Sequence, residues 1–264
     1  MTDFHVMAGT EKALSLPAVR KISTSDVIDA LGRGLDDFWQ KPSHYAFLCL
    51  IYPLVGVVLI YSASGANALP LLFPLASGFA LLGPFAAIGL YEISRRREAG
   101  LDTSWWHALA VRKSPAIPSI MAVGAMLFAI FVTWLLVAQG LYVRLLGPEP
   151  PASYTQFLEL LFTTDAGLML LTLGNAIGFI FALVVLITTV IAFPMLLDRD
   201  CGAVAAIVTS VRAASVNPLP IALWGVLVAG ALIVGSLPLF AGLAVVMPVL
   251  GHATWHLYRK LVAD

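Results

Sequence analysis

Six long apolar runs dominate this chain and constrain its fold more than any other feature. Each is long enough to cross the hydrocarbon core of a bilayer, which takes roughly 20 helical residues at about 1.5 Å each. In lipid every backbone N–H and C=O must be satisfied without water, so such runs must be helical. The six predicted spans lie near 44–63, 69–92, 117–141, 166–197, 219–236 and 238–258. The sequence therefore predicts an all-α, polytopic membrane helix bundle.

The composition excludes an ordinary soluble domain. Apolar residues make up 60% of the chain and charged residues 11%, against about 45–50% and about 25% in soluble domains. The formal net charge is zero, so nothing suggests a nucleic-acid partner. We expect a loosely ordered cytoplasmic arm over residues 1–22 and one membrane domain over residues 23–264, with the lipid bilayer as its main partner.

The placement of basic residues predicts the orientation. Of the 15 Lys and Arg residues, all except Arg144 fall on one side of a six-span arrangement, in the N-terminal arm, the second and fourth connections and the C-terminus. Basic residues concentrate on the cytoplasmic side of membrane proteins. Both chain ends are therefore predicted to lie in the cytoplasm, with the spans arranged as three hairpins.

A short amphipathic segment precedes each pair of spans and ends in a polar residue followed by proline. The three segments are Asp26 to Lys41-Pro42, Ser104 to Ser114-Pro115 and Gly202 to Asn217-Pro218. Proline disfavours helix at the residue before it, which suits an interfacial helix that turns into the bilayer. Ser23 and Asp26 have the spacing of a capping box at the start of the first segment.

Asn175 is the strongest hydrogen-bonding side chain near the middle of a predicted span. It lies between Gly174 and Gly178, residues whose small size favours close helix packing. Two interpretations stay open, a hydrogen bond between helices and a polar position on a transport pathway. No acidic or basic residue lies centrally in a span, which disfavours an ion-coupled transporter.

His252 and His256 lie four residues apart near the end of the last predicted span, on one helical face. A pair with this spacing can bind a metal or reach a haem. However, no Glu follows the first His as in zinc proteases, and no Cys/His cluster supplies further ligands. The alternative is that both anchor the helix in the headgroup layer beside Trp255, and we expect no cofactor.

Charged residues close the second and fourth predicted spans. Glu92 is one helical turn from Arg96, and Asp198 and Arg199 follow the fourth span. These side chains either bind anionic lipid headgroups or a partner's loop, or only end the helices at the interface. Because phosphate-binding loops, nucleophile elbows and catalytic acid pairs are absent from the sequence, we do not expect an enzyme.

Several stretches resemble a known family. They are Phe73 to Phe79, Gly89 to Arg95, Phe193 to Arg199 and Gly251 to Arg259. Together they resemble the bacterial predicted integral membrane proteins of domain-of-unknown-function family 2189, over nearly the whole chain after about Val19. The resemblance implies a location in the bacterial cytoplasmic (inner) membrane and no activity. Some members are labelled as similar to a cytochrome c oxidase subunit, but this chain lacks the intramembrane histidines of the oxidase core subunit.

Three functions remain open from the sequence. The first is a non-catalytic membrane protein that binds or assists another membrane complex, or itself. The second is a transporter or channel for a small solute or lipid, with a pathway past Asn175. The third is a metal or haem site at His252 and His256. The scarcity of charge inside the spans favours the first.

Overall fold

A computed structural model describes most of the chain. The described residues are 16–40, 70–104, 106–107, 111–112, 114–199, 201–238 and 242–263. Their regular structure is helical, and their β-type pairing is limited to an isolated antiparallel bridge between Val19 and Val262. The all-α prediction is confirmed for this part of the chain.

The contacts of the chain form two compact units, and the single membrane domain over residues 23–264 stays a prediction. The terminal unit comprises the described residues of Met1–Tyr52, Gly83–Ala125 and Leu186–Asp264. The hairpin unit comprises those of Pro53–Leu82 and Met126–Val185. Two helices, α7 (Ile117–Leu146) and α9 (Asp165–Thr189), each contribute residues to both units, so the division does not follow a linker.

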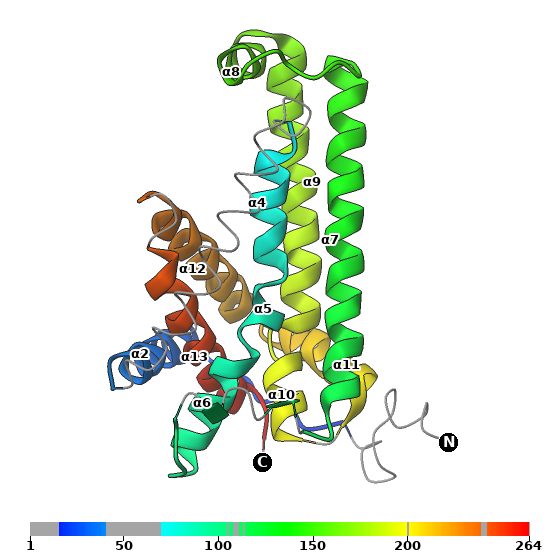
Figure 1. Cartoon of the computed structure of the whole chain (residues 1–264). Coiled ribbons are helices and arrows are strands. Elements are labelled where there is room, and N and C mark those ends of the chain that lie inside the picture. Colours follow the sequence, from blue (N-terminus) through cyan, green and yellow to red (C-terminus); the bar gives the residue numbers. More distant parts are fainter. Residues whose placement is uncertain are drawn as a thin grey trace. The chain divides into compact units, whose positions relative to one another are not determined.

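In the hairpin unit, α4 (Leu72–Leu81) lies alongside α7 and α9 (Figure 1). Trp134 of α7 joins all three helices. Its indole N–H donates to the Pro74 carbonyl of α4 at 2.8 Å, and its ring lies 5.6 Å from the Phe181 ring of α9. Gly178 of α9 leaves room for this ring, since a Cβ there would be 3.1 Å from Trp134. The small residues thus serve close helix packing.

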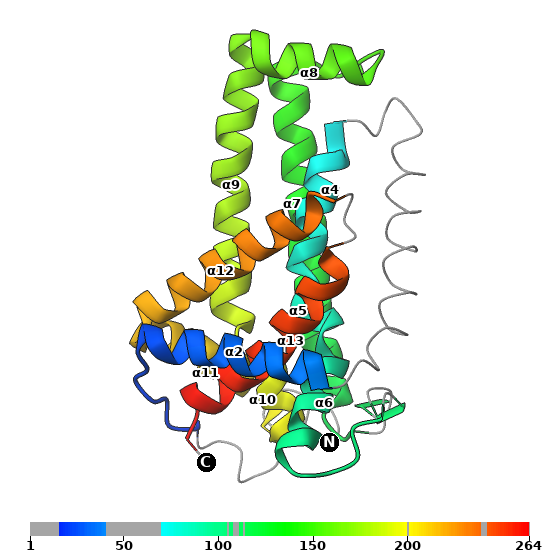
Figure 2. The same cartoon turned by 90° about the vertical axis from the view of Figure 1, so that its left-hand side faces the viewer.

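Helix α8 (Tyr154–Thr163) lies across the start of α9 (Figure 2). Ser153 caps it by accepting from the Gln156 N–H at 3.1 Å, and the Gln156 side chain accepts in return from the Ala152 N–H at 2.6 Å. Gly167 of α9 permits the contact, because a Cβ there would collide with the Leu160 carbonyl.

The terminal unit is built around α13 (Leu243–Leu261), which packs against α2, α6, α10 and α12 (Figure 2). Its core includes the buried side chains of Trp255, Leu257 and Tyr258. The surrounding helices are α2 (Thr24–Gln40), α5 (Gly83–Ala86), α6 (Ile88–Glu98), α10 (Ala192–Asp198), α11 (Gly202–Val216) and α12 (Pro218–Ser236).

Three of the predicted spans are confirmed as helices long and apolar enough to cross a membrane. They are Ile117–Leu146, Asp165–Asp198 and Pro218–Ser236. The second of these contains α9 and α10 with a turn at residues 190–191 between them. The length and composition of these three helices are those of an integral membrane protein.

The other predicted spans differ or lie outside the description. The run 69–92 is broken into α4, α5 and α6 by turns at Leu82 and Ala87. Pro84 explains a break, because it lacks an N–H and its ring clashes with the carbonyl four residues earlier. Helix α13 is absent from the candidate spans, and its last turn contains Arg259 and Lys260. The span at 44–63 falls outside the described residues, so six spans and three hairpins stay predictions.

Two of the three amphipathic segments are confirmed as helices, α2 and α11. Asp26 and Ser23 form the predicted capping box, with the Ser23 N–H donating to Asp26 Oδ2 at 2.9 Å and the Asp26 N–H to Ser23 Oγ at 3.3 Å. In the segment after Ser104, the described residues form only short turns. Of the predicted arm over residues 1–22, the structure describes residues 16–22, and part of this stretch is hydrogen-bonded to the rest of the chain.

We predict that Gly78→Ala destabilises the hairpin unit. A Cβ at Gly78 would be 2.7 Å from Trp134 Cδ1, and that ring is held by its bond to Pro74. Overpacking of this kind costs about 1–3 kcal/mol of unfolding free energy. Denaturation in detergent micelles, followed by circular dichroism, measures the change.

The matched control is Gly140→Ala on α7, where a Cβ would meet nothing within 4 Å. This variant should be as stable as the parent or slightly more stable, because Ala favours helix over Gly. Equal destabilisation by both changes would contradict the packing assigned to Gly78.

Candidate functional site: the Asp37 cluster

The amphipathic pattern of α2 brings a carboxylate against α13. One face of α2 is buried and consists of Val27, Ala30, Gly34, Asp37 and Phe38. At Gly34 the two helices approach so closely that a Cβ would be 2.5 Å from the Ala253 backbone nitrogen. The contact places Asp37, one turn further along α2, beside the histidines of α13.

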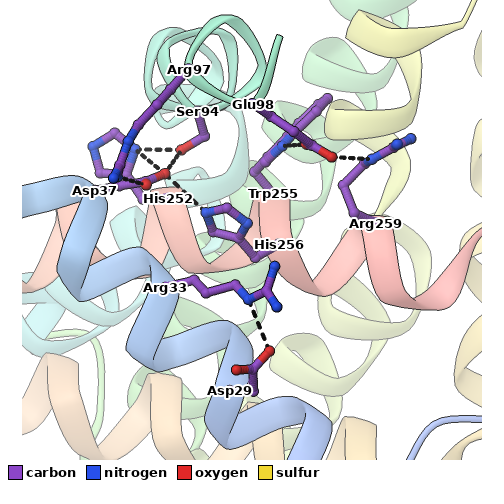
Figure 3. Close-up of polar contacts among 10 residues, drawn as sticks. All are labelled: Asp29, Arg33, Asp37, Ser94, Arg97, Glu98, His252, Trp255, His256 and Arg259. Atoms are coloured by element: carbon purple, nitrogen blue, oxygen red, sulfur yellow. Dashed lines mark hydrogen bonds and ion pairs between the residues drawn. The ribbon is translucent and has the colours of Figure 1, made fainter. Parts of the chain in front are cut away.

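Asp37 is the centre of a buried polar network that we call the Asp37 cluster (Figure 3). Its Oδ2 accepts from Ser94 Oγ at 2.5 Å and from His256 Nε2 at 3.0 Å. Arg97 donates to Asp37 Oδ1. The cluster is Asp37, Ser94, Arg97, His252 and His256, and it connects α2, α6 and α13.

His252 joins the network through Ser94. Its Nδ1 lies 2.7 Å from Ser94 Oγ and 3.9 Å from Asp37 Oδ2, and the residue is fully buried. A serine hydroxyl has one proton, which Ser94 donates to Asp37. It follows that Ser94 accepts from His252, whose Nδ1 must then carry a proton.

Two opposing effects act on the pKa of Asp37. Burial raises it, since a carboxylate loses hydration, while hydrogen bonds from His256 and Ser94 and the nearby histidine charges lower it. The lowering effects win, and the pKa lies below its usual value of 3.8. Asp37 is therefore a carboxylate at neutral pH and the acceptor around which the donors are arranged.

The cluster contains serine, histidine and aspartate but does not have the geometry of a hydrolase triad. In a triad the histidine lies between serine and carboxylate, whereas Ser94 bonds to Asp37 directly. Ser94 is also 1% exposed, which leaves no room for a substrate carbonyl. The arrangement is suited to holding three helices together.

The two predicted metal ligands, His252 and His256, converge on the Asp37 carboxylate. Among the described residues, His, Cys, Asp and Glu side chains form no group of three or more that could hold a metal ion. The metal or haem hypothesis for this pair stays a prediction. The structure assigns both rings a hydrogen-bonding role within the cluster.

A second group of contacts connects the end of α13 to α6 and α10. Glu98 accepts from Trp255 Nε1 at 2.7 Å and from Arg259 Nε at 3.0 Å. Arg259 also lies 3.6 Å from Asp198, which accepts from the Tyr258 hydroxyl at 2.6 Å. Side chains near the end of α13 thus bind both α6 and α10.

Three of the four predicted ligand or partner residues lie around one cavity. Glu92, Asp198 and Arg199 line a space of about 400 Å³ in the terminal unit. Glu92 pairs with Arg95 at 2.8 Å and with Arg96, one helical turn away, at 3.6 Å. Whether a ligand or partner binds there stays a prediction.

Asn175, the fourth predicted residue, belongs to the hairpin unit. It is exposed on the surface of α9, and its Nδ2 donates to the Leu171 carbonyl of the same helix at 2.8 Å. One amide hydrogen is therefore satisfied within α9.

The sequence reasoning missed Asp37, Ser94 and Arg97. A signal for Asp37 was present, because it occurs at helical spacing from Ala30 and Gly34 on the face of α2 that is buried. An acidic residue on such a face needs a partner. Ser94 and Arg97 carry no comparable signal, since their role depends on how α6 meets α2.

We predict that Asp37→Asn loosens α2 from α13. The change removes the negative charge that faces Arg97 and the histidines and replaces one acceptor oxygen with an NH2 group, and breaking a buried pair costs about 3 kcal/mol or more. Hydrogen exchange of α2 amides should become faster and the unfolding free energy should fall. Asp36→Asn is the control, because Asp36 is exposed and its substitution should change stability by less than about 0.5 kcal/mol. Equal effects of the two changes would argue against the cluster.

The stabilisation by Asp37 should also depend on pH. Because the folded-state pKa is lowered, the carboxylate contributes fully above its unfolded pKa near 3.8 and loses its contribution as the pH falls through the lowered folded value. The difference in unfolding free energy between the parent and Asp37→Asn should shrink over this acidic range. A difference that stays constant with falling pH would show that Asp37 acts through shape alone.

Comparison with known proteins finds similarity to one family of predicted integral membrane proteins. No curated protein and no solved structure matches the chain significantly. A family model described as "Predicted integral membrane protein (DUF2189)" matches residues 71–198. The match includes the stretches Phe73 to Phe79 and Gly89 to Arg95 and the stretch from Phe193 as far as Asp198, but not Gly251 to Arg259. Residues 71–198 of the chain are thus similar to the DUF2189 family of predicted integral membrane proteins.

Proposed function

We propose that this protein is a non-catalytic partner of another membrane protein in the bacterial cytoplasmic membrane. It crosses the bilayer six times, with both ends in the cytoplasm. It recognises its partner through a helix surface in the membrane that includes Asn175. The family match and the three apolar helices support the membrane location.

The meeting of the two chain ends supports an even number of spans. Arg20 N–H donates to the Leu261 carbonyl at 2.8 Å, and Ala263 N–H donates to the Ala18 carbonyl at 3.0 Å. Both described ends of the chain therefore lie on the same side of any membrane that the chain crosses. The distribution of Lys and Arg then favours the cytoplasmic side.

One observation carries the partner role, an exposed stripe on α9 that includes the polar side chains of Thr172 and Asn175. Leu168, Thr172, Asn175 and Phe179 repeat at helical spacing along one stripe, and all four are exposed. Their neighbours on the exposed surface of this helix are large apolar residues such as Leu173 and Ile180. One amide hydrogen of Asn175 is satisfied within α9, but in lipid the remaining polar atoms of the amide are costly unless another helix offers a hydrogen bond. We therefore expect this stripe of α9 to pack against a transmembrane helix of the partner, and we expect that helix to carry a side chain that hydrogen-bonds to Asn175.

The polar groups of the terminal unit support a non-catalytic role. In the Asp37 cluster and around Glu98 and Asp198, carboxylates accept hydrogen bonds from groups on other helices. These bonds hold α2, α6, α10 and α13 together and leave Ser94 buried. Helix assembly accounts for the arrangement without a reacting substrate.

Labelling of single cysteines tests the proposed sidedness. In a chain with Cys49 and Cys201 replaced by Ala, a membrane-impermeant maleimide should label Glu149→Cys in intact cells. It should label Leu101→Cys, near the Arg95–Arg97 cluster, only after the membrane is opened. Both positions are exposed. The reverse pattern would contradict the orientation.

Photo-crosslinking in native membranes tests the partner surface. A photoreactive residue at Ala176, beside Asn175 and exposed, should give one protein adduct of defined mass. Asn175→Leu should reduce its yield about tenfold, since a hydrogen bond between membrane helices is worth about 1–2 kcal/mol. Thr133→Val on α7 is the control, because Thr133 is exposed and bonds to its own helix. An adduct with the mass of two copies would make the partner a second copy, and adducts with lipid alone would overturn the proposal.

A further inference from the structure

The cations near the two described ends of the chain are brought together. The bridge between Val19 and Val262, with the bond from Arg20 N–H to the Leu261 carbonyl, places residues 19–21 beside residues 261–263. Arg20, Lys21, Arg259 and Lys260 all line one cavity as a result.

Asn217 holds the first of these segments in place. Its Oδ1 accepts from the Ile22 N–H at 2.8 Å, and its Nδ2 donates to the Arg20 carbonyl at 3.0 Å. Asn217 lies between α11 and α12 and is 2% exposed. The backbone that carries Arg20 and Lys21 is therefore fixed by a buried side chain.

The cavity lies within the terminal unit, has a volume of about 740 Å³ and is lined mainly by charged side chains. Six of these are cations: Arg20, Lys21, Arg33, Arg97, Arg259 and Lys260. Cavities of a few hundred cubic ångströms are typical of small-molecule sites.

Most carboxylates of the cavity already accept from a cation. Asp37 accepts from Arg97, Glu98 from Arg259 and Asp26 from Lys260. Arg33 pairs with Asp29.

Arg20 and Lys21 differ from the other cations of the cavity. Within the described part of the chain, neither of these exposed side chains has an acidic partner, and only Asp36 among the lining carboxylates lacks a basic one. The walls of the cavity therefore have an excess of positive charge.

We propose that this cavity binds a phosphate-bearing anion through Arg20 and Lys21. A guanidinium donates two parallel hydrogen bonds to phosphate oxygens, and an ammonium adds a mobile charge. The volume exceeds that of bare phosphate and suits a phosphate on a larger group. Two sources share this chemistry, the headgroup of an anionic phospholipid and a soluble phosphate compound. This inference does not rest on the partner role of Asn175.

The test compares lipid and soluble phosphate on the full chain. The parent and Arg20→Gln/Lys21→Gln are reconstituted in nanodiscs of phosphatidylcholine. One arm measures binding of radiolabelled pyrophosphate by equilibrium dialysis. The other counts phosphatidylglycerol molecules retained by native mass spectrometry after mixed-lipid reconstitution. Arg212→Gln is the control, since Arg212 is an exposed cation on α11 that does not line the cavity.

We expect the parent to bind in at least one arm. Binding should be weakened about tenfold or more in the double variant, because two charge-assisted hydrogen bonds are lost. Binding by Arg212→Gln should be unchanged. Binding should also weaken with added salt. Phosphatidylglycerol alone would identify a headgroup, and pyrophosphate alone a soluble compound. The double variant should fold normally, as both side chains are exposed, and unchanged unfolding midpoints check this. Binding in neither arm, or equal binding by parent and double variant, overturns the proposal.

Discussion

The buried carboxylate of Asp37 is the interaction on which the arrangement of the terminal unit depends. Apolar surfaces give little preference between helices in a membrane, because lipid tails are as apolar as leucine. A buried carboxylate is different, since it is stable only where several donors converge on it. Ser94, Arg97 and His256 meet this need from two helices that are distant in the sequence. Once Asp37 is in place, the position of α2 on α13 and α6 is specified.

The two units achieve helix packing by different means. In the hairpin unit, glycines and an aromatic ring bring α4, α7 and α9 close, and Trp134 adds a hydrogen bond to a backbone carbonyl. In the terminal unit, carboxylates and their donors connect helices that are shorter or amphipathic. This difference matches their composition, because ionisable residues are costly in lipid and concentrate where protein or water surrounds them.

Much of the helical structure could be predicted from the sequence, because it depends on local patterns. Helical periodicity and the Ser23–Asp26 capping box indicated α2, and apolar length indicated α7, α9 and α12. The run 69–92 differed because apolar length alone does not show the effect of Pro84 inside it. Helix α13 differed because it begins only at Leu243 and its second half carries His252, His256, Arg259 and Lys260, so the helix as a whole is not apolar enough to be a candidate span.

The candidate site was only partly predictable for the same reason. The spacing of His252 and His256 showed that they share a face, but not that the face meets a carboxylate from α2. Glu92, Asp198 and Arg199 were selected as charges that end helices, and their position around one cavity depends on how α6 and α10 pack. Asn175 was identified from its chemistry, whereas its exposure required the structure.

A double-mutant cycle between Asp37 and Arg97 tests the central claim most directly. Asp37→Asn, Arg97→Gln and the double variant are unfolded in the same detergent, and the coupling free energy is taken from the four unfolding free energies. Because the two side chains share a hydrogen bond between α2 and α6, we predict a coupling of about 1–3 kcal/mol. A coupling near zero, with the two single effects simply adding, would contradict the claim that this carboxylate joins the helices.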